Sequence, residues 1–249
     1  MPQLTWLVTG TSSGFGDQFV PSILAKGDRV IATARRRHGR LGNLKDAGAA
    51  ILDLDVTAPQ AELDAKVQEA LNIDGGIDVL VNNAAYIEAA LIEELHPSRL
   101  LKGFETNLFG PINLTRSLLP HFREKRKGII LFMSSVGTYT GAVGAGYYRT
   151  NIFAPTNIKS GQPSIPNYAR FSKLYQAGVN ALHFNQPGDP RKATDRIVGK
   201  VRSEGKNMPP RFPVGADAVE TIRGDCSKKM EKCDEWEAFS SDTNLDPEQ

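Results

Sequence analysis

Short apolar runs alternate with longer amphipathic stretches along the first 135 residues of the chain. This alternation is typical of a doubly wound α/β domain, because each parallel strand in such a domain is covered on both faces and needs a continuous apolar run. The runs predict five strands, at residues 5–8, 29–34, 50–54, 78–82 and 129–132.

Amphipathic periodicity predicts helices between and after these strands, at residues 14–26, 59–71, 98–127, 189–204 and 216–236. The helix at 189 has a clear start, since Asp189 is a favoured N-cap and Pro190 a favoured first residue. Glycines and prolines interrupt residues 137–166, so we expect no sheet-covering helix there. The chain reads as one domain, with an intact part (1–135), an irregular part (136–188), C-terminal helices (189–240) and a frayed tail (241–249).

Composition narrows the range of partners. The 249 residues are 40% hydrophobic, which suits one domain with a sizeable core. Their net charge of +2 gives no field that would favour nucleic acid or an anionic membrane, so we expect a small-molecule partner. No leader pattern and no membrane-length apolar run are visible, which predicts a cytoplasmic protein. Cys226 and Cys233 lack neighbouring ligands and are interpreted as reduced thiols, with no metal site.

A glycine-rich turn joins the first strand to the first helix. A helix N-terminus offers unpaired N–H groups and a positive dipole end, and glycines let a pyrophosphate approach the backbone closely. An ordinary strand-to-helix turn is the alternative, but the position within a βαβ unit favours dinucleotide binding. The expected contacts are Gly10, Ser12, Ser13, Gly14, Phe15 and Gly16.

The G-x-x-x-G-x-G spacing of this turn resembles the short-chain dehydrogenase/reductase family, and a fungal-type oxidoreductase branch in particular. Further matches follow in chain order. Asp55 and Val56 resemble the family's adenine contact, and residues 82–85 resemble its Asn-Asn-Ala-Gly motif, with Ala85 in place of glycine. The resemblance implies a Rossmann-type fold and adds Asn82 and Ala84 to the cofactor contacts. It also makes Asn107 the active-site asparagine, although Asn107 or Asp55 taken singly would more often be a capping or solvated residue.

The end of the second strand bears on the choice of cofactor. An NAD enzyme of this fold usually carries an acid there for the ribose hydroxyls, whereas a 2′-phosphate needs a cation. Here Ala34 stands in the acid's place, and Arg35, Arg36 and Arg37 follow. Because a guanidinium matches phosphate oxygens, we expect NADP(H), bound at least by Arg35. A solvated basic turn is the alternative.

The resemblance implies hydride transfer between nicotinamide and an alcohol or carbonyl substrate, with a serine, a tyrosine and a lysine in the site. Ser135 ends the fifth strand and Tyr148 follows thirteen residues later, as in the family. The lysine belongs four residues on, where Ile152 stands. A cation ~4 Å from the phenol would contribute about 4 kcal/mol and lower its pKa by roughly three units. Tyr168 and Lys173, five residues apart, are interpreted as surface or packing residues.

The resemblance also implies that a segment is absent beside Tyr148, because residues 149–151 resemble the end of the family's Pro-Gly-x-x-x-Thr motif. Thr150 would then be the nicotinamide-side threonine. The family's tyrosine helix and sixth strand have no room here, since a βαβ crossover needs a dozen or more residues. We therefore expect the fifth strand to be an unpaired edge, and the family's dimer interface, which uses the fourth and fifth helices, to be compromised.

Three functions follow from these observations. The first is an NADP(H)-dependent oxidoreductase in which Ser135 and Tyr148 act as the acid/base pair, supported by Asn107. The second is a module that binds nucleotide or a partner without catalysis, and the third is an unstable product of a skipped exon or gene-model error. The residues after Asn151 that would line the substrate pocket do not identify a substrate.

Overall fold

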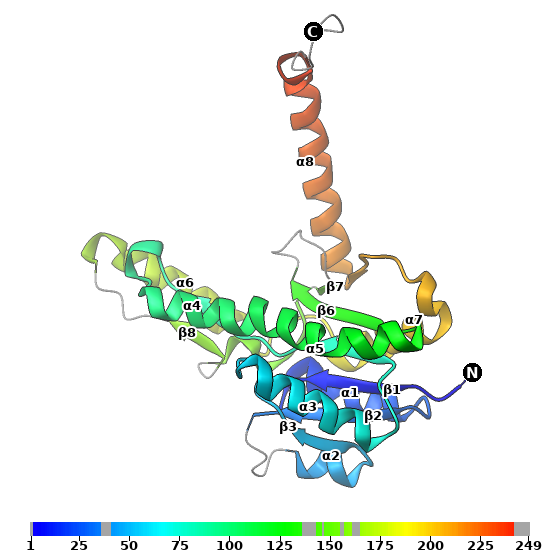
Figure 1. Ribbon diagram of the computed structural model, residues 1–249. Helices are drawn as coiled ribbons and strands as arrows, with labels where there is room; N and C mark the ends of the chain where they lie inside the picture. The colour runs from blue at the N-terminus through cyan, green and yellow to red at the C-terminus, as the bar shows by residue number, and fades with distance from the viewer. Residues whose placement is uncertain are drawn as a thin grey trace, which may run out of the picture.

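A seven-stranded parallel sheet lies at the centre of the computed structural model, which describes residues 2–35, 41–135, 143–145, 147–154, 157–160 and 165–241 (Figure 1). The strand order is β3-β2-β1-β4-β6-β7-β9. The five strands predicted from the sequence are confirmed as β1 (Thr5–Thr9), β2 (Arg29–Ala34), β3 (Ala50–Asp53), β4 (Val79–Asn82) and β6 (Ile129–Ser135).

Helices cover both faces of this sheet. On one face α1 (Gly14–Leu24) packs against α7 (Pro190–Glu204), and on the other α3 (Gln60–Ile73) packs against α5 (Gly110–Lys125) (Figure 1). Successive strand residues point to opposite faces, so Trp6 and Val8 enter the first core while Leu7 enters the second. The predicted doubly wound α/β architecture is therefore confirmed. A short helix, α2 (Gly42–Asp46), precedes β3.

The long helix predicted at residues 98–127 is interrupted near its middle. It begins as α4 (Pro97–Phe104), passes through a π-helical segment (Glu105–Phe109) and continues as α5. Arg126 ends α5 in the left-handed conformation, with φ 52°. Asn107 lies within the π-helical segment, a feature often found at functional sites.

The position next to β6 is occupied, so the prediction of an unpaired edge is wrong. The strand β7 (Val143–Ala145) pairs in parallel with Met133, Ser134 and Ser135, and β9 (Pro213–Val214) pairs with β7. Three residues are enough to occupy the sixth place in the sheet, without the long crossover expected for a sixth strand. In the described part of residues 136–168 there is no α-helix, as the glycines and prolines predicted.

A smaller lobe beside the sheet was not foreseen from the sequence. It joins β5 (Ile87–Ala89) in parallel with β8 (Ile158–Ser160), beside α6 (Ala169–Leu182) and α4. Arg99 of α4 donates to Glu88 of β5 and to the carbonyl of Lys159 in β8. The short 3₁₀ turns are η1 (Ile92–Glu94), η3 (Asn151–Phe153), η4 (Pro166–Tyr168) and η5 (Gly205–Asn207).

The last helix, α8 (Ala216–Ser240), extends away from the body of the molecule (Figure 1). Cys226 and Cys233 lie exposed on it as free thiols. Among the helices that the structure describes, none is long and apolar enough to cross a membrane. The predicted tail falls almost entirely outside the described residues, which stop at Ser241.

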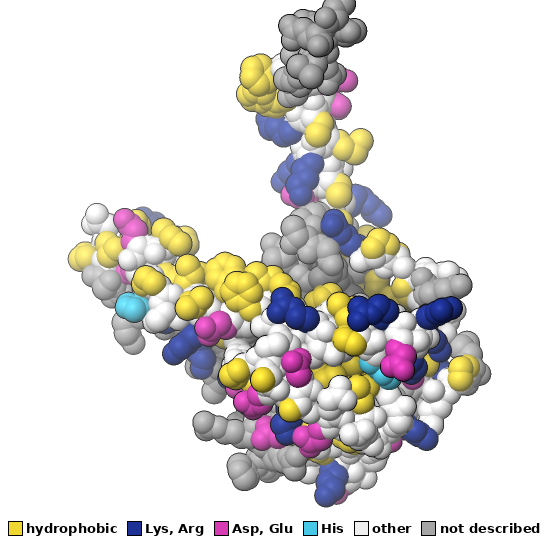
Figure 2. Space-filling view, viewed as in Figure 1, with side chains coloured by type: hydrophobic (Ala, Val, Ile, Leu, Met, Phe, Trp, Pro, Cys, Tyr) yellow, Lys and Arg dark blue, Asp and Glu magenta, His cyan; other side chains and the backbone are white. Residues whose placement is uncertain are grey.

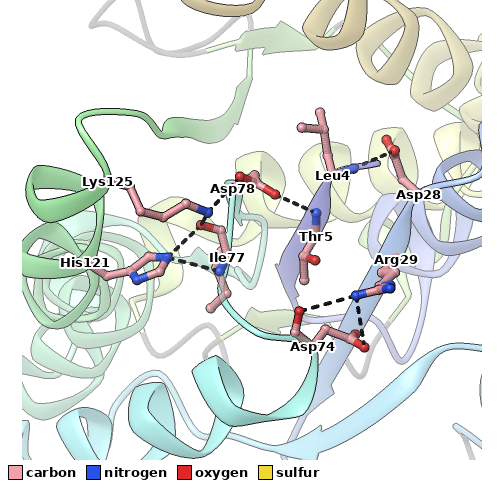
Figure 3. Close-up of polar contacts among 9 residues, drawn as sticks. All are labelled: Leu4, Thr5, Asp28, Arg29, Asp74, Ile77, Asp78, His121 and Lys125. Atoms are coloured by element: carbon pink, nitrogen blue, oxygen red, sulfur yellow. Dashed lines mark hydrogen bonds and ion pairs between the residues drawn. The ribbon is translucent and has the colours of Figure 1, made fainter. Parts of the chain in front are cut away.

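Polar contacts fasten the amino-terminal ends of the strands (Figure 3). The carboxylate of Asp78 accepts hydrogen bonds from the backbone N–H of Thr5, at 3.0 Å, and from Nζ of Lys125, at 2.9 Å. Burial raises the pKa of the Asp78 carboxyl, but these two hydrogen bonds and the positive charges of Lys125 and Lys127 together outweigh burial, and the pKa lies below its usual value. Asp28 accepts from the N–H of Leu4 at 2.9 Å in the same way. These contacts fix one end of the sheet and leave the carboxyl ends of the strands free for a site.

Candidate functional site

The glycine-rich turn after β1 is pressed against the end of β4. Gly10 and Gly14 adopt left-handed φ angles of 71° and 63°, which favour glycine. A methyl group on Gly10 would lie 2.8 Å from Cα of Ala84, and one on Gly16 would lie 2.2 Å from the carbonyl oxygen of Gly10. The backbone can take this path only because these positions carry no side chain.

Two side chains hold the turn in place, and the sequence did not single them out. Oγ1 of Thr9 accepts hydrogen bonds from the backbone N–H of Asn83, at 2.9 Å, and of Ala84, at 3.0 Å. Nδ2 of Asn83 donates to the carbonyl oxygen of Thr9, at 2.9 Å. Asn83 stands inside the motif at residues 82–85, and Thr9 directly precedes the glycine-rich turn, so their places in the sequence are the signal that could have identified them.

The start of α1 presents backbone amides at this turn. The first N–H groups of a helix have no partner within it, and Ser13 occupies the N-cap position without a capping hydrogen bond from its side chain. Ser12 is exposed, and Ser13, Gly14 and Phe15 are half-buried. The amide of Thr11, in contrast, is taken by the carbonyl of Thr33 at 2.9 Å. The arrangement therefore offers its free amides from Ser12 onward, where an anion can approach.

Arg35 follows directly on β2 and is exposed, while Arg36 and Arg37 lie outside the described residues. The positive charge of Arg35 acts on the phenol of Tyr86, in the loop after β4. Burial and then Glu88 raise the pKa of the Tyr86 phenol, and Arg99 and Arg35 lower it only in part. A guanidinium thus stands within electrostatic range of the carboxyl ends of the central strands.

The residues expected at the adenine end make local contacts after β3. The side chain of Asp55 accepts hydrogen bonds from the N–H and the hydroxyl of Thr57, at 2.9 Å and 2.8 Å. Val56 is buried, and its carbonyl oxygen lies so close to Gly110 that a methyl group there would approach to 2.8 Å. Asp55 therefore stabilises the loop after β3, and Val56 packs against Gly110 at the start of α5.

Two asparagines flank the space beyond β4. Asn82 donates to Oγ1 of Thr115 at 3.3 Å, while its buried Oδ1 has no hydrogen-bond partner in the described part of the protein. Asn107 is bonded in both directions to the backbone of Tyr86: its Nδ2 donates to the carbonyl at 2.9 Å, and its Oδ1 accepts from the N–H at 3.2 Å. The π-helical segment thus fixes the loop that follows β4.

Thr150 lies beside the glycine-rich turn, although Gly14 and Thr150 are 136 positions apart in the sequence. A methyl group on Gly14 would lie 3.6 Å from Cβ of Thr150 and 3.6 Å from Oδ1 of Asn151, which is ordinary contact. Thr150 is buried and caps η3, since its hydroxyl accepts from the N–H of Ile152 at 3.4 Å. The structure therefore places Thr150 beside the first residue of α1, and its contact with the nicotinamide stays a prediction.

Tyr148 lies in the core beneath the same turn. Its ring meets that of Phe15 edge-on, with the centroids 5.0 Å apart, and it is only 7% exposed. Burial and the charge of Asp217 raise the pKa of its phenol, and Arg196 offsets this only in part. This direction is opposite to the one that a neighbouring lysine would produce. Phe15, expected at the cofactor, here supports the tyrosine.

The other expected active-site positions are held by different elements. Ser135 is exposed at the end of β6, opposite Ala145 of β7. Tyr148 forms an isolated parallel bridge with Gly188, whereas Ile152 belongs to the 3₁₀ turn η3. Tyr148 and Ile152 therefore do not lie on one helix. The helical spacing of four that would bring the side chain at position 152 beside the phenol of Tyr148 is thus not formed. Tyr168 donates to Glu93 at the surface, and Lys173 is exposed on α6.

Comparisons with known proteins agree with this geometry. The family model for short chain dehydrogenases matches residues 5–154. An oxidoreductase of Botryotinia fuckeliana, BOA17, is 29% identical over 270 aligned positions that cover 94% of this chain and 97% of that protein. Those positions outnumber the 249 residues here, so part of the relative has no counterpart in this chain.

Two further similarities extend along most of the chain. The oxidoreductase YusZ of Bacillus subtilis is 35% identical, with 84% of this chain and 88% of that protein covered. A solved short-chain dehydrogenase from Streptomyces avermitilis superposes with a TM-score of 0.82 at 32% identity, covering 97% of this chain and 98% of that one. With its parallel sheet, its glycine-rich turn and these matches, the chain belongs to the short-chain dehydrogenase/reductase family of oxidoreductases.

Proposed function

We propose that this chain binds NADP(H) in the cradle between the glycine-rich turn and the end of β4. The observation that carries the proposal is the close approach of Gly10 to Ala84 and of Gly16 to the carbonyl oxygen of Gly10, which holds the turn against the end of β4 with the start of α1 beside it. The amides from Ser12 to Phe15 would face the pyrophosphate, stabilised by the positive end of α1. Asp55 and Val56 would lie toward the adenine, and Asn82, Ala84 and Thr150 toward the nicotinamide.

Arg35 supports NADP(H) over NAD(H). It follows the strand end where a ribose hydroxyl acceptor would stand in an NAD enzyme, and the strand itself ends in Ala34. No carboxylate of β2 therefore competes for the guanidinium, which is exposed and available for a 2′-phosphate.

We propose hydride transfer between the nicotinamide and an alcohol or carbonyl substrate as the reaction. The bound cofactor supplies the hydride. Ser135 would hold the substrate oxygen, Tyr148 would exchange its proton, and Asn107 would support the site through the loop that it fixes at Tyr86. Because the phenol pKa is raised, Tyr148 stays protonated at neutral pH and can donate a proton far more readily than accept one. The expected direction is reduction, with slow turnover.

Binding of NADP(H) without turnover is the second candidate. It is favoured by the burial of Tyr148 against Phe15 and by the separation of Ile152 from any helix containing the tyrosine. The nucleotide-binding part of the site does not depend on either feature. The chain would then serve as a nucleotide-dependent module.

One pair of assays separates the two candidates. Purified chain is titrated with NADPH by fluorescence, and then assayed for NADPH consumption with a panel of ketones and aldehydes. Turnover that is lost in Tyr148→Phe while NADPH affinity persists supports the oxidoreductase. Binding with no turnover on any substrate supports the second candidate, and folded chain that binds neither NADPH nor NADH contradicts both.

We also propose that a second copy covers part of the long helix. Hydrophobic side chains gather along α4 and α5 (Figure 2). The exposed ones are Leu100, Leu101, Phe104, Leu108, Phe109, Ile112 and Leu119. Since the family's tyrosine helix is not found among the described residues, this interface would be smaller and weaker than the family's. Light scattering over a concentration series should show a reversible monomer–dimer equilibrium, and a monomer at all concentrations would contradict it.

A further inference from the structure

Residues 186–188 are hydrogen-bonded to the residues on either side of Tyr148. The N–H of Gly188 donates to the carbonyl oxygen of Tyr147 at 3.0 Å, and the N–H of Arg149 donates to the carbonyl oxygen of Gly188 at 2.8 Å. Nε of Arg149 also donates to the carbonyl oxygen of Gln186 at 3.3 Å. A methyl group on Gly188 would lie 2.5 Å from Cδ1 of Tyr148, so the two strands of chain are in close contact. Residues 147–150 are thus held from one side by residues 186–188.

The side chain of Gln186 extends these hydrogen bonds to Thr150. Its side chain is fully buried, with an exposed fraction of 0%, and its Nε2 donates to the carbonyl oxygen of Thr150 at 3.4 Å. Its Oε1 is also buried and has no hydrogen-bond partner among the described residues. An unsatisfied buried oxygen costs about 1–3 kcal/mol. The amide at this position therefore makes its contact with Thr150 at the cost of one unpaired buried oxygen, which an apolar side chain of the same length would not have.

Residues 186–188 lead into α7, and α7 is bonded to α1, the helix that begins in the glycine-rich turn. Asp189 caps α7 by accepting from the N–H of Arg191 at 2.9 Å. Further along α7, Oγ1 of Thr194 lies 2.9 Å from Oγ of Ser22 in α1, and its one hydroxyl proton is shared between the carbonyl oxygens of Arg191, at 2.9 Å, and of Gln18 in α1, at 3.3 Å. A short, hydrogen-bonded path therefore runs from α1 through α7 and Gln186 to Thr150, which lies against the first residue of α1.

We propose that Gln186 is a positioning residue that sets Thr150 against the glycine-rich turn for the nicotinamide half of the dinucleotide. It acts through the carbonyl of Thr150 and does not itself touch the cofactor. The inference rests on the proposed NADP(H) site.

If Gln186 positions Thr150, its loss should weaken the binding of NADPH without a matching loss of thermal stability. The variant Gln186→Met tests this. Methionine keeps the length of the side chain and removes the unsatisfied oxygen, but it also leaves the carbonyl of Thr150 without its donor; because these two effects oppose each other, the midpoint of thermal unfolding should change little. The dissociation constant of NADPH should rise about tenfold, as expected for the loss of one oriented hydrogen bond. The dissociation constant of 2′,5′-ADP, which lacks the nicotinamide half, should change less than twofold.

Two further variants complete the experiment. Gln176→Met is the matched control, because Gln176 lies exposed on α6 and donates to Asn180; it should leave all three measurements unchanged. Gln186→Glu should bind NADPH as weakly as Gln186→Met at pH 8. It should regain affinity as the pH falls, since the protonated acid can again donate to Thr150.

The outcomes are distinct. A wild-type chain that does not bind NADPH removes the proposed function on which the inference rests. If the wild type binds NADPH and Gln186→Met binds it within twofold, the positioning role is refuted. A parallel loss of thermal stability, NADPH affinity and 2′,5′-ADP affinity would assign Gln186 a structural role and also overturn the inference.

Discussion

Replacement of Gly16 by alanine places a methyl group where the turn has no room for one. The added Cβ would lie 2.2 Å from the carbonyl oxygen of Gly10 and 2.7 Å from Nδ2 of Asn83. The first neighbour is backbone, so the turn itself must move. The second donates to the carbonyl oxygens of Thr9, at 2.9 Å, and of Gly10, at 3.3 Å, and its displacement would weaken both bonds.

Overpacking of this kind typically costs about 1–3 kcal/mol. If the cost falls on the binding-competent turn, the dissociation constant of NADPH should rise by roughly 5- to 150-fold, at about 1.4 kcal/mol for each factor of ten. Fluorescence titration measures the affinity, and urea unfolding measures the share that falls on global stability. The loss of binding free energy and the loss of unfolding free energy should together amount to about 1–3 kcal/mol.

Gly199→Ala is the matched control, because it makes the same change inside α7. A Cβ at Gly199 meets no atom within 4 Å, and alanine in a helix interior stabilises by about 0.5–1 kcal/mol. This variant should bind NADPH as the wild type does. Equal NADPH affinity and equal stability in the two variants would refute the cradle as the binding site.

Three further perturbations test other parts of the account. Arg35→Ala should raise the dissociation constant of NADPH by about tenfold or more and leave that of NADH nearly unchanged, because only the 2′-phosphate loses a charged partner; equal losses for both nucleotides would count against it. Asp28→Ala leaves Nε1 of Trp6 without its 3.0 Å acceptor and removes the buried partner of Arg202, so urea unfolding should show a loss of about 3–5 kcal/mol. The folded-state pKa of Asp78 is lowered, so its contribution is present above the unfolded value of ~3.9 and is lost as the pH falls toward the folded value; Asp78→Asn should therefore flatten the acid limb of the stability curve, and an unchanged limb would argue against this pair.

The nucleotide-binding half could be predicted from the sequence because its signals are local. The strand at residues 29–34 has the predicted bounds, since a continuous apolar run marks a strand covered on both faces. Asp189 was predicted to cap a helix and does so through the N–H of Arg191. The position of Thr150 beside Gly14 could be expected only through the family resemblance, because no pattern links residues so far apart in the chain.

The second half could not be predicted in the same way. Strands of three residues, such as β7 and β8, are too short to show a period, and they form only because a neighbouring strand edge pairs with them. The position of Tyr148 depends on a bridge to Gly188, forty residues along the chain, and on the ring of Phe15. Sequence spacing relates Tyr148 to Ser135 as in the family, but it could not show that the phenol lies in the core.

Calorimetric titration of the purified chain with NADPH, followed by NADH, tests the central claim most directly. The account predicts one binding site for NADPH, with clearly weaker binding of NADH because Arg35 meets no 2′-phosphate. Circular dichroism recorded on the same sample establishes that the chain is folded. A folded chain that releases or absorbs no heat with either nucleotide at several temperatures would contradict the account.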